Sequence, residues 1–210
     1  MNAIILAAGE GKRLMPLTKD TPKALIKING KPLLQYHLDK LLAQDYKNIV
    51  VTCFTHADQI KKFLIENYAM KNVQVSEERE LLGTGGGIKN AMKLINNDDC
   101  LIVNADIFSD IDYGKFKDCR SPKVFAVRAK KGDFNIKKNK VFLDVSRGYT
   151  FTGISIINKS FFSKINLQVF DYWQEVLKPI AALNELEAEI IDANWYDVGT
   201  MDALKNFRNE

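Results

Sequence analysis

The sequence contains few of the residues that build covalent or metal-bound frameworks. Its 210 residues include three cysteines, at positions 53, 100 and 119, and two histidines. The cysteines are odd in number and far apart, and no CxxC pair occurs, so the pattern argues against a disulfide scaffold and against a structural zinc site. This cysteine usage is typical of the reducing cytoplasm, where we expect the protein to reside.

Long hydrophobic runs are absent as well. The first apolar run, residues 4–8 (IILAA), has no basic residue in front of it and does not match a signal peptide. No run approaches the ~20 residues of a transmembrane helix. We therefore expect no membrane partner.

The chain as a whole has only a small excess of positive charge. The chain carries 30 Lys and Arg against 26 Asp and Glu, a formal net charge of +4. Residues 1–31 hold six basic and two acidic residues, so this stretch alone has the same net charge as the whole chain. With 46% hydrophobic residues the composition is that of a globular protein, and the local positive charge favours an acidic partner near the N-terminus.

Short apolar segments alternate with amphipathic ones over the first half of the chain. The pattern predicts buried strands at 3–7, 48–54, 73–76 and 100–104, and helices at 32–42, 57–68 and 87–94. Continuous apolar strands separated by helices are typical of a parallel sheet covered on both faces. The first half therefore predicts an α/β fold with a Rossmann-like, doubly wound, mostly parallel sheet.

The rhythm changes after residue 110. Closely spaced strands are predicted at 123–128, 134–136, 141–145 and 150–157, and we expect them to form an antiparallel extension of the sheet. A helix at 171–183, short strands at 189–191 and 195–198 and a helix from 201 complete the chain. Since no linker or repeat interrupts it, we predict one domain over residues 1–210.

A glycine-rich turn follows the first strand at residues 6–14 (LAAGEGKRL). Its two glycines let backbone N–H groups approach an anion, and Lys12 and Arg13 add positive charge. The dinucleotide fingerprint GxGxxG fails at Leu14, and the P-loop pattern has no match. By itself the turn is either a phosphate-binding loop or a plain exit from the strand.

The residues that follow make the interpretation more specific. The string GEGKRLMPLTKDTPKAL, residues 9–25, resembles the signature of the sugar-1-phosphate nucleotidyltransferases, which wraps a nucleotide triphosphate. The resemblance implies the nucleotide-diphospho-sugar transferase fold and two catalytic residues, Arg13 on the triphosphate and Lys23 at the reacting phosphate. It also implies that the loop binds nucleotide through Leu6, Ala7, Ala8, Gly9, Gly11 and Lys12.

The chemistry of nucleotidyl transfer suits these residue types. The reaction depends mainly on positioning and on neutralising phosphate charge. A guanidinium grips phosphate oxygens in pairs, whereas a lysine ammonium is a mobile point charge. Without the motif around it, Lys23 would be interpreted as a solvated loop lysine.

Two aspartates lie at the ends of predicted strands. Asp106 follows a buried strand in the string NAD, and Asp197 lies in the string WYDVGT. Both strings resemble family motifs whose aspartates together hold Mg²⁺, and one or two carboxylates plus substrate phosphates are a common Mg²⁺ arrangement. We therefore predict Mg²⁺ as the cofactor, bound by Asp106 and Asp197. The alternative is that an aspartate caps the next helix, above all at Asp197.

The segment ELLGTGGGI, residues 80–88, resembles the part of the family that lines the base pocket. The nucleotide-binding prediction therefore extends to Glu80, Gly83, Thr84 and Asn104. The GTGGGI form, with KGDF at 131–134 and FTGIS at 151–155, resembles N-acetylmuramate-1-phosphate uridylyltransferases. By that likeness Gly85, Gly132, Asp133 and Thr152 would lie near the sugar, although a Gly-Asp pair between strands is also a common hairpin turn.

The resemblance implies a Mg²⁺-dependent transferase that joins a nucleoside triphosphate to a sugar 1-phosphate and releases pyrophosphate. UTP and N-acetylmuramate 1-phosphate, a pair of cell-wall recycling, are the favoured substrates. The alternatives are a guanylyltransferase for mannose or heptose 1-phosphate, a phosphocholine cytidylyltransferase, or a nucleotide-binding module without turnover. The oligomeric state stays open.

A nucleic-acid-binding module is the rival from another class. Residues 128–140 hold six basic residues and one acidic residue. The stretch lacks the aromatic spacing and the motifs of known nucleic-acid binders. We therefore expect no nucleic-acid partner and interpret the stretch as a solvated hairpin or a sheet edge protected by lysines.

Overall fold

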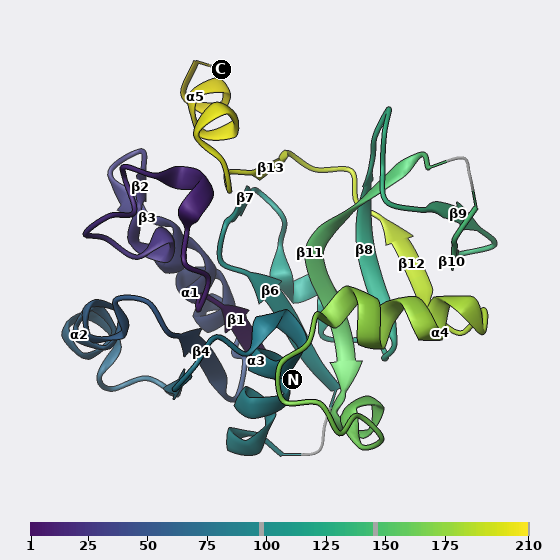
Figure 1. Cartoon of the computed structure of the whole chain (residues 1–210), viewed down its shortest axis with the longest axis horizontal. Helices are drawn as coiled ribbons and strands as arrows, with labels where there is room; N and C mark the ends of the chain where they lie inside the picture. Colours follow the sequence, from purple (N-terminus) through teal and green to yellow (C-terminus); the bar gives the residue numbers. More distant parts are fainter. Residues whose placement is uncertain (97–98, 145–146, 210) are drawn as a thin grey trace.

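A nine-stranded sheet forms the centre of the molecule, with the strand order β5-β4-β1-β6-β11-β8-β12-β10-β9 (Figure 1). The computed structural model describes residues 1–96, 99–144 and 147–209. One half of the sheet is parallel and consists of β5 (Val73–Glu77), β4 (Ile49–Cys53), β1 (Asn2–Leu6) and β6 (Asp99–Asn104). These are the four strands predicted in the first half of the chain, so the parallel α/β core is confirmed; β5, at the edge of the sheet, is only partly buried.

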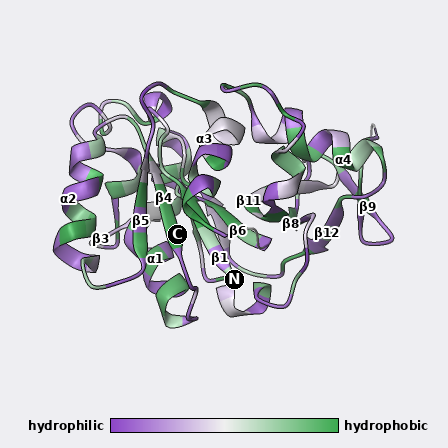
Figure 2. Cartoon of the chain, turned by 90° about the horizontal axis from the view of Figure 1, so that it is seen from below, coloured by the Kyte–Doolittle hydropathy of each residue, from purple (hydrophilic) through white to green (hydrophobic). Residues whose placement is uncertain are grey.

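Helices cover both faces of this parallel half. α1 (Leu33–Ala43) and α2 (Ala57–Tyr68) pack on one face, and α3 (Gly83–Ala91) with a 3-10 turn over Met92–Leu94 packs on the other. Side chains of a strand alternate between the two cores, as in β1, where Ile5 faces α1 and α2 and Ile4 faces α3. The apolar strands therefore lie between layers of helices (Figure 2).

The other half of the sheet is mixed. β11 (Tyr149–Asn158) pairs antiparallel with both β6 and β8 (Lys123–Arg128), and β9 (Asn135–Lys137) pairs antiparallel with β10 (Lys140–Phe142). The predicted antiparallel extension is confirmed; the last residue of the strand predicted at 141–145 lies outside the described residues. β12 (Glu187–Ile190) lies between β8 and β10 and runs parallel to β8, which spacing along the chain did not reveal.

Two helix predictions need correction. α3 begins at Gly83, four residues before the predicted start, because tertiary contacts stabilise a first turn whose glycines have low helix propensity. The helix predicted at 171–183 consists of a π-helical turn over Trp173–Leu177 followed by α4 (Lys178–Ala182). Among the described residues no helix has the length and apolar character needed to cross a bilayer.

Two small ribbons lie apart from the main sheet. β7 (Ile107–Ser109) pairs antiparallel with β13 (Trp195–Asp197), and β2 (Lys27–Ile28) pairs with β3 (Lys31–Pro32). The last helix, α5 (Met201–Asn209), follows β13. Of these elements, only β13 and α5 were predicted.

A buried histidine joins α1 to the segment after β6. His37 is 2% exposed, and its Nδ1 shares a hydrogen bond of 2.7 Å with the hydroxyl of Tyr113. Burial, together with the nearby charge of Lys40, lowers the pKa of His37 from 6.5 to about 4. His37 is therefore neutral at physiological pH and serves as a polar core residue.

We predict that His37 makes stability fall with acidification. Because its pKa is lower in the folded state, the unfolded chain gains a proton from about pH 6.5 downward while the folded chain stays neutral until about pH 4. This contributes a loss of at most about 3 kcal/mol between those pH values. In urea titrations, His37→Gln should be less stable than wild type at pH 8, and the gap should narrow at pH 4.5; a gap of constant size would contradict the prediction.

Candidate active site

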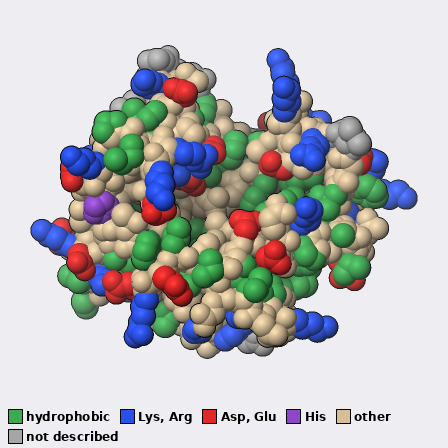
Figure 3. All heavy atoms as spheres, viewed as in Figure 1, with side chains coloured by type: hydrophobic (Ala, Val, Ile, Leu, Met, Phe, Trp, Pro, Cys, Tyr) green, Lys and Arg blue, Asp and Glu red, His purple; other side chains and the backbone are tan. Residues whose placement is uncertain are grey.

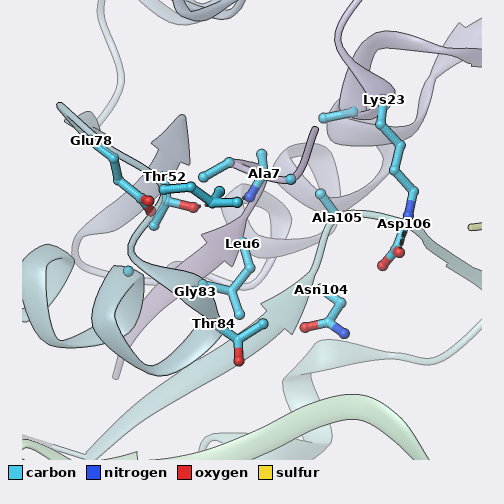
Figure 4. Close-up of a pocket in the computed structure, with 15 residues that line it drawn as sticks. Leu6, Ala7, Lys23, Thr52, Glu78, Gly83, Thr84, Asn104, Ala105 and Asp106 are labelled. Atoms are coloured by element: carbon cyan, nitrogen blue, oxygen red, sulfur yellow. Dashed lines mark hydrogen bonds and ion pairs between the residues drawn. The ribbon is translucent and has the colours of Figure 1, made fainter. Parts of the chain in front are cut away.

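A pocket opens where the carboxyl ends of β1, β4 and β6 meet the start of α3. It is lined by Leu6, Ala7, Ala8, Gly9, Lys23, Ala24, Thr52, Glu78, Leu81, Gly83, Thr84, Gly87, Asn104, Ala105 and Asp106. Lys23 and Asp106 lie at one end of the pocket, and Glu78 and Thr52 lie at the other (Figure 4). From outside, the molecule is hollowed in the middle of one face, with basic and acidic side chains next to each other at the rim (Figure 3). This is the edge of the sheet where α/β proteins bind ligands.

The glycine-rich loop is held at both ends. At its start, the backbone N–H of Ala7 donates to Oγ1 of Thr52, a buried hydrogen bond of 3.0 Å to β4. Further on, Gly11 has a positive φ of 68°, and its carbonyl accepts a hydrogen bond of 2.8 Å from the Thr18 hydroxyl. A side chain at Gly11 would meet Thr18, so this glycine is needed for the turn itself. Beyond it a 3-10 turn (Lys12–Leu14) presents Arg13 at the surface.

Two carboxylates far apart in the sequence are brought together by the β7–β13 ribbon. Asp197 pairs with Ile107 in this ladder, and the N–H of Val198 donates to the carbonyl of Asp106 at 3.0 Å. Lys23, on a 3-10 turn over Lys23–Leu25, forms an ion pair with Asp106. The side chains of Lys23 and Asp106 are 14% and 22% exposed, so this pair is only partly screened by water.

Gly199 shows how closely these charges converge. A Cβ built on Gly199 would lie 2.6 Å from Oδ1 of Asp197, 3.0 Å from Nζ of Lys23 and 3.1 Å from Oδ2 of Asp106. One point in space is therefore surrounded by two carboxylates and an ammonium. Only a residue without a side chain fits there, which explains the glycine of the string DVGT.

The donor set around Gly199 suits Mg²⁺. Mg²⁺ prefers oxygen ligands and is commonly held by one or two carboxylates plus substrate phosphates. Within the described ranges no group of three or more His, Cys, Asp or Glu side chains forms a metal cluster, so the protein offers two carboxylates here. At Asp197 the capping alternative is wrong: its Oδ1 accepts the N–H of Gly199 at 2.8 Å, before α5 begins, and Oγ1 of Thr200 accepts the N–H of Ala203 as the cap of α5.

Glu78 lines the opposite end of the pocket. It is 5% exposed, and its Oε2 accepts a hydrogen bond of 2.9 Å from the backbone N–H of Leu82. Burial raises the pKa of this carboxyl, while the hydrogen bond from Leu82 partly counteracts the rise. Glu80, the acidic residue predicted from sequence, is exposed and does not line the pocket. The run Glu77–Glu80 offers three acids, and only the fold shows which one points inward.

Two of the three consecutive glycines of α3 allow another segment to pack against the helix, while the third, Gly87, faces Glu78. We call residues 165–172 the strap. The carbonyl of Phe170 in the strap accepts hydrogen bonds from the N–H groups of Gly85 and Gly86, at 3.0 and 3.3 Å. A Cβ on Gly86 would lie 2.2 Å from the carbonyl oxygen of Gln168, and one on Gly85 would meet the ring of Phe170. The strap also fixes the pocket residue Thr84, whose Oγ1 accepts the N–H of Tyr172 at 2.8 Å.

Comparisons with known proteins agree with this geometry. The family model described as "Nucleotidyl transferase" matches residues 2–126, which include β1, the glycine-rich loop, α3 and Asp106. The chain belongs to the nucleotidyl transferase family.

Curated relatives of this nucleotidyl transferase match over nearly their whole length. An N-acetylmuramate alpha-1-phosphate uridylyltransferase of Neisseria meningitidis is 30% identical, with 98% of this chain and 96% of the relative covered. A D-glycero-alpha-D-manno-heptose 1-phosphate guanylyltransferase of Campylobacter jejuni is 28% identical, with 99% and 98% covered.

Solved structures match the fold as well. HddC from Yersinia pseudotuberculosis, complexed with GMP-PN, has a TM-score of 0.80 at 27% identity, with 98% of this chain and 96% of that chain covered. The CTP:phosphocholine cytidylyltransferase LicC from Streptococcus pneumoniae has a TM-score of 0.82 at 22% identity, with 99% and 97% covered, which shows a common fold.

The structure of this nucleotidyl transferase gathers about half of the predicted site residues at one pocket. Those that line it are Leu6, Ala7, Ala8, Gly9, Lys23, Gly83, Thr84, Asn104 and Asp106. Sequence reasoning missed the other lining residues, of which Thr52 and Glu78 carry polar groups. The roles in binding and catalysis stay predictions for all of them.

The residues predicted near the sugar lie outside this lining. Thr152 is fully buried and donates its hydroxyl to the carbonyl of Phe125 at 2.7 Å. Asp133 accepts the N–H of Phe151 at 2.9 Å, and a Cβ on Gly132 would meet the backbone of Tyr149. These contacts give the three residues packing and loop-fixing roles. Gly132 and Asp133 do not form a hairpin turn, since β8 and β9 on either side of them do not pair with each other. A contact with sugar stays a prediction.

We predict that alanine substitutions at two glycines of the pocket region affect different properties, stability in one case and nucleotide binding in the other. Gly86→Ala should lower the free energy of unfolding by about 1–3 kcal/mol, because the methyl group overlaps the carbonyl of Gln168. No atom lies within 4 Å of a Cβ on Gly9, so Gly9→Ala should change stability by less than about 0.5 kcal/mol. Since Gly9 lines the pocket, this variant should instead weaken nucleotide binding.

Urea denaturation and calorimetric nucleotide titration measure the two effects separately. Equal losses of stability in both variants would contradict the packing role of Gly86. Nucleotide affinity that is unchanged in Gly9→Ala would remove the loop from the binding site.

Proposed function

We propose that this chain transfers a nucleotidyl group from a nucleoside triphosphate to a sugar 1-phosphate and releases pyrophosphate. The convergence of Lys23, Asp106 and Asp197 beside Gly199 carries this proposal, since Lys23 and Asp106 also line one end of the pocket. A triphosphate that follows the glycine-rich loop would bring its α-phosphate to these groups.

The protein's contribution is to hold and neutralise phosphates. An oxygen of the sugar phosphate attacks the α-phosphorus, the bond from the α-phosphorus to the bridging oxygen of the β-phosphate breaks, and pyrophosphate leaves. Lys23 places positive charge at the reacting phosphate and Arg13 grips the triphosphate. Because the attacking oxygen is already ionised at neutral pH, no general base is needed.

Asp106 and Asp197 would hold Mg²⁺. The ion, when bound, supplies positive charge to the phosphate oxygens, as is usual in phosphoryl transfer. The two carboxylates would be the ligands that the protein supplies, and substrate phosphates would supply others.

UTP and N-acetylmuramate 1-phosphate are the substrates we favour, which would assign the chain to cell-wall recycling. The segments GTGGGI, KGDF and FTGIS support this choice, as does the match to the Neisseria meningitidis uridylyltransferase over nearly the whole chain.

GTP and heptose 1-phosphate form the second candidate pair. The buried carboxylate of Glu78 supports it, because guanine presents two N–H donors side by side on its Watson–Crick edge and a carboxylate can accept both. The Campylobacter jejuni relative also matches over nearly the whole chain.

Pyrophosphate release from UTP, GTP, CTP, ATP and dTTP, each tested against N-acetylmuramate, heptose, mannose and glucose 1-phosphates and phosphocholine, decides between these pairs. We expect the highest kcat/KM with UTP and N-acetylmuramate 1-phosphate. A preference for GTP and heptose 1-phosphate would establish the second pair, and no release from any combination would contradict the proposed function.

Substitutions at the reactive end should lower turnover strongly. We predict that Lys23→Ala, Asp106→Asn and Asp197→Asn each reduce kcat by about 10²–10³-fold, since each removes charge at the reacting phosphate or from the Mg²⁺ site. Lys19→Ala, an exposed lysine of the same loop, is the matched control and should retain wild-type kcat. Activity of the wild type should vanish in EDTA and return with Mg²⁺. Wild-type turnover in either aspartate variant would refute the metal assignment.

A further inference from the structure

A third apolar cluster lies apart from the two cores of the main sheet. We call it the platform cluster. Its buried members come from the glycine-rich loop, the segment after Lys23, the start of α1, the end of β13 and α5, and each is at most 7% exposed: Leu14, Ile26, Ile28, Leu33, Val198 and Leu204. Aromatic side chains from β7, β13 and α5 pack around it: Phe108, Tyr196 and Phe207.

Each proposed reactive residue is next to this cluster along the chain. Leu14 directly follows Arg13, and Val198 directly follows Asp197. Ile26 closes the 3-10 turn of Lys23, because its N–H donates to the Lys23 carbonyl at 3.1 Å. Phe108 is two residues beyond Asp106. The backbone of all four reactive residues is therefore attached to one small apolar unit.

α5 closes this unit from outside. Leu204 is 1% exposed, and the ring of Phe207 lies 4.8 Å from that of Phe108 and 5.0 Å from that of Tyr196, centroid to centroid. Phe207 thus contacts the strand that follows Asp106 and the strand that carries Asp197. In Figure 1, α5 lies beyond the β7–β13 ribbon, at the end of the molecule where the β2–β3 hairpin also lies.

We infer that α5 is a positioning element of the reactive site, and this inference rests on the proposed function. Through Leu204 and Phe207 the helix fixes the distances between the phosphate-binding loops and the two aspartates. None of its residues lines the pocket. Small displacements of reactive groups have large effects on rate, since the reaction depends on positioning.

The structure separates this role from general stability. The cores on the two faces of the sheet contain no residue of α5. The Glu78 end of the pocket is built by β4, β5 and α3, and none of these contributes to the platform cluster. A change in α5 should therefore act on catalysis more than on the sheet or on the Glu78 end.

The test compares Leu204→Ala and Phe207→Ala with Lys205→Ala, an exposed residue of the same helix. We expect kcat to fall about 10- to 100-fold in the first two variants, while KM for the nucleoside triphosphate changes less than about three-fold. Leu204→Met, which keeps the volume, should restore kcat. The control should behave as wild type, and the thermal transition of the sheet should stay cooperative in all variants.

The inference is overturned if kcat is unchanged in both alanine variants. It is also overturned if kcat falls only in proportion to the fraction of protein that is unfolded. Phe207→Ala tests this, because Phe207 is partly exposed and its loss should destabilise the fold less than the loss of the buried Leu204. A 10- to 100-fold rise of KM with unchanged kcat would assign the helix to substrate binding instead and would likewise overturn the inference.

Amide hydrogen exchange distinguishes a failure of this inference from a failure of the proposed function, because it does not depend on enzymatic activity. If the wild type releases no pyrophosphate from any substrate pair, the proposed function fails, and exchange still reports on the platform. Faster exchange at Val198 and Ile26 in Leu204→Ala, without a change in β1 or β4, supports the positioning role of α5. Unchanged exchange at both residues refutes it.

Discussion

The hydrogen bond from the Val198 N–H to the Asp106 carbonyl joins the two segments on which the reactive site depends. It extends the β7–β13 ladder by one step, and through it two carboxylates that are far apart in the sequence lie close together beside Gly199. Bringing like charges together is unfavourable unless a cation lies between or beside them. Lys23 provides one such charge, and the backbone ladder holds the carboxylates in place whatever the charge balance.

The two ends of the pocket have different architectural origins. At the Glu78 end, rigid elements of the main sheet and α3 shape the cavity, and the strap holds the start of α3 through Phe170 and Thr84. At the other end, loops and a two-strand ribbon carry the reactive groups. The platform cluster gives these irregular segments the packed support that a sheet gives its strands. Specificity and reaction chemistry can therefore vary separately on one fold.

Much of the fold follows from local patterns. The parallel strands β1, β4 and β6 are largely apolar runs, so their burial on both faces could be predicted, and α2 has the bounds that its periodicity indicates. β12 could not be placed, because its neighbours in the sheet come from distant parts of the chain. The start of α3 was missed because its glycines are poor helix formers, and contacts with the strap and with Glu78, which are remote from local periodicity, stabilise this first turn.

The sequence by itself determined the chemical groups of the site: the glycine-rich loop, Lys23 and two aspartates at the ends of strands, because motifs preserve residue type and spacing. Only the tertiary structure decided which of those groups meet. It selected Glu78 over Glu80, assigned the glycines of α3 to packing against the strap, and connected α5 to the reactive residues. The reason is physical, since burial and distance depend on contacts between segments that are remote in sequence.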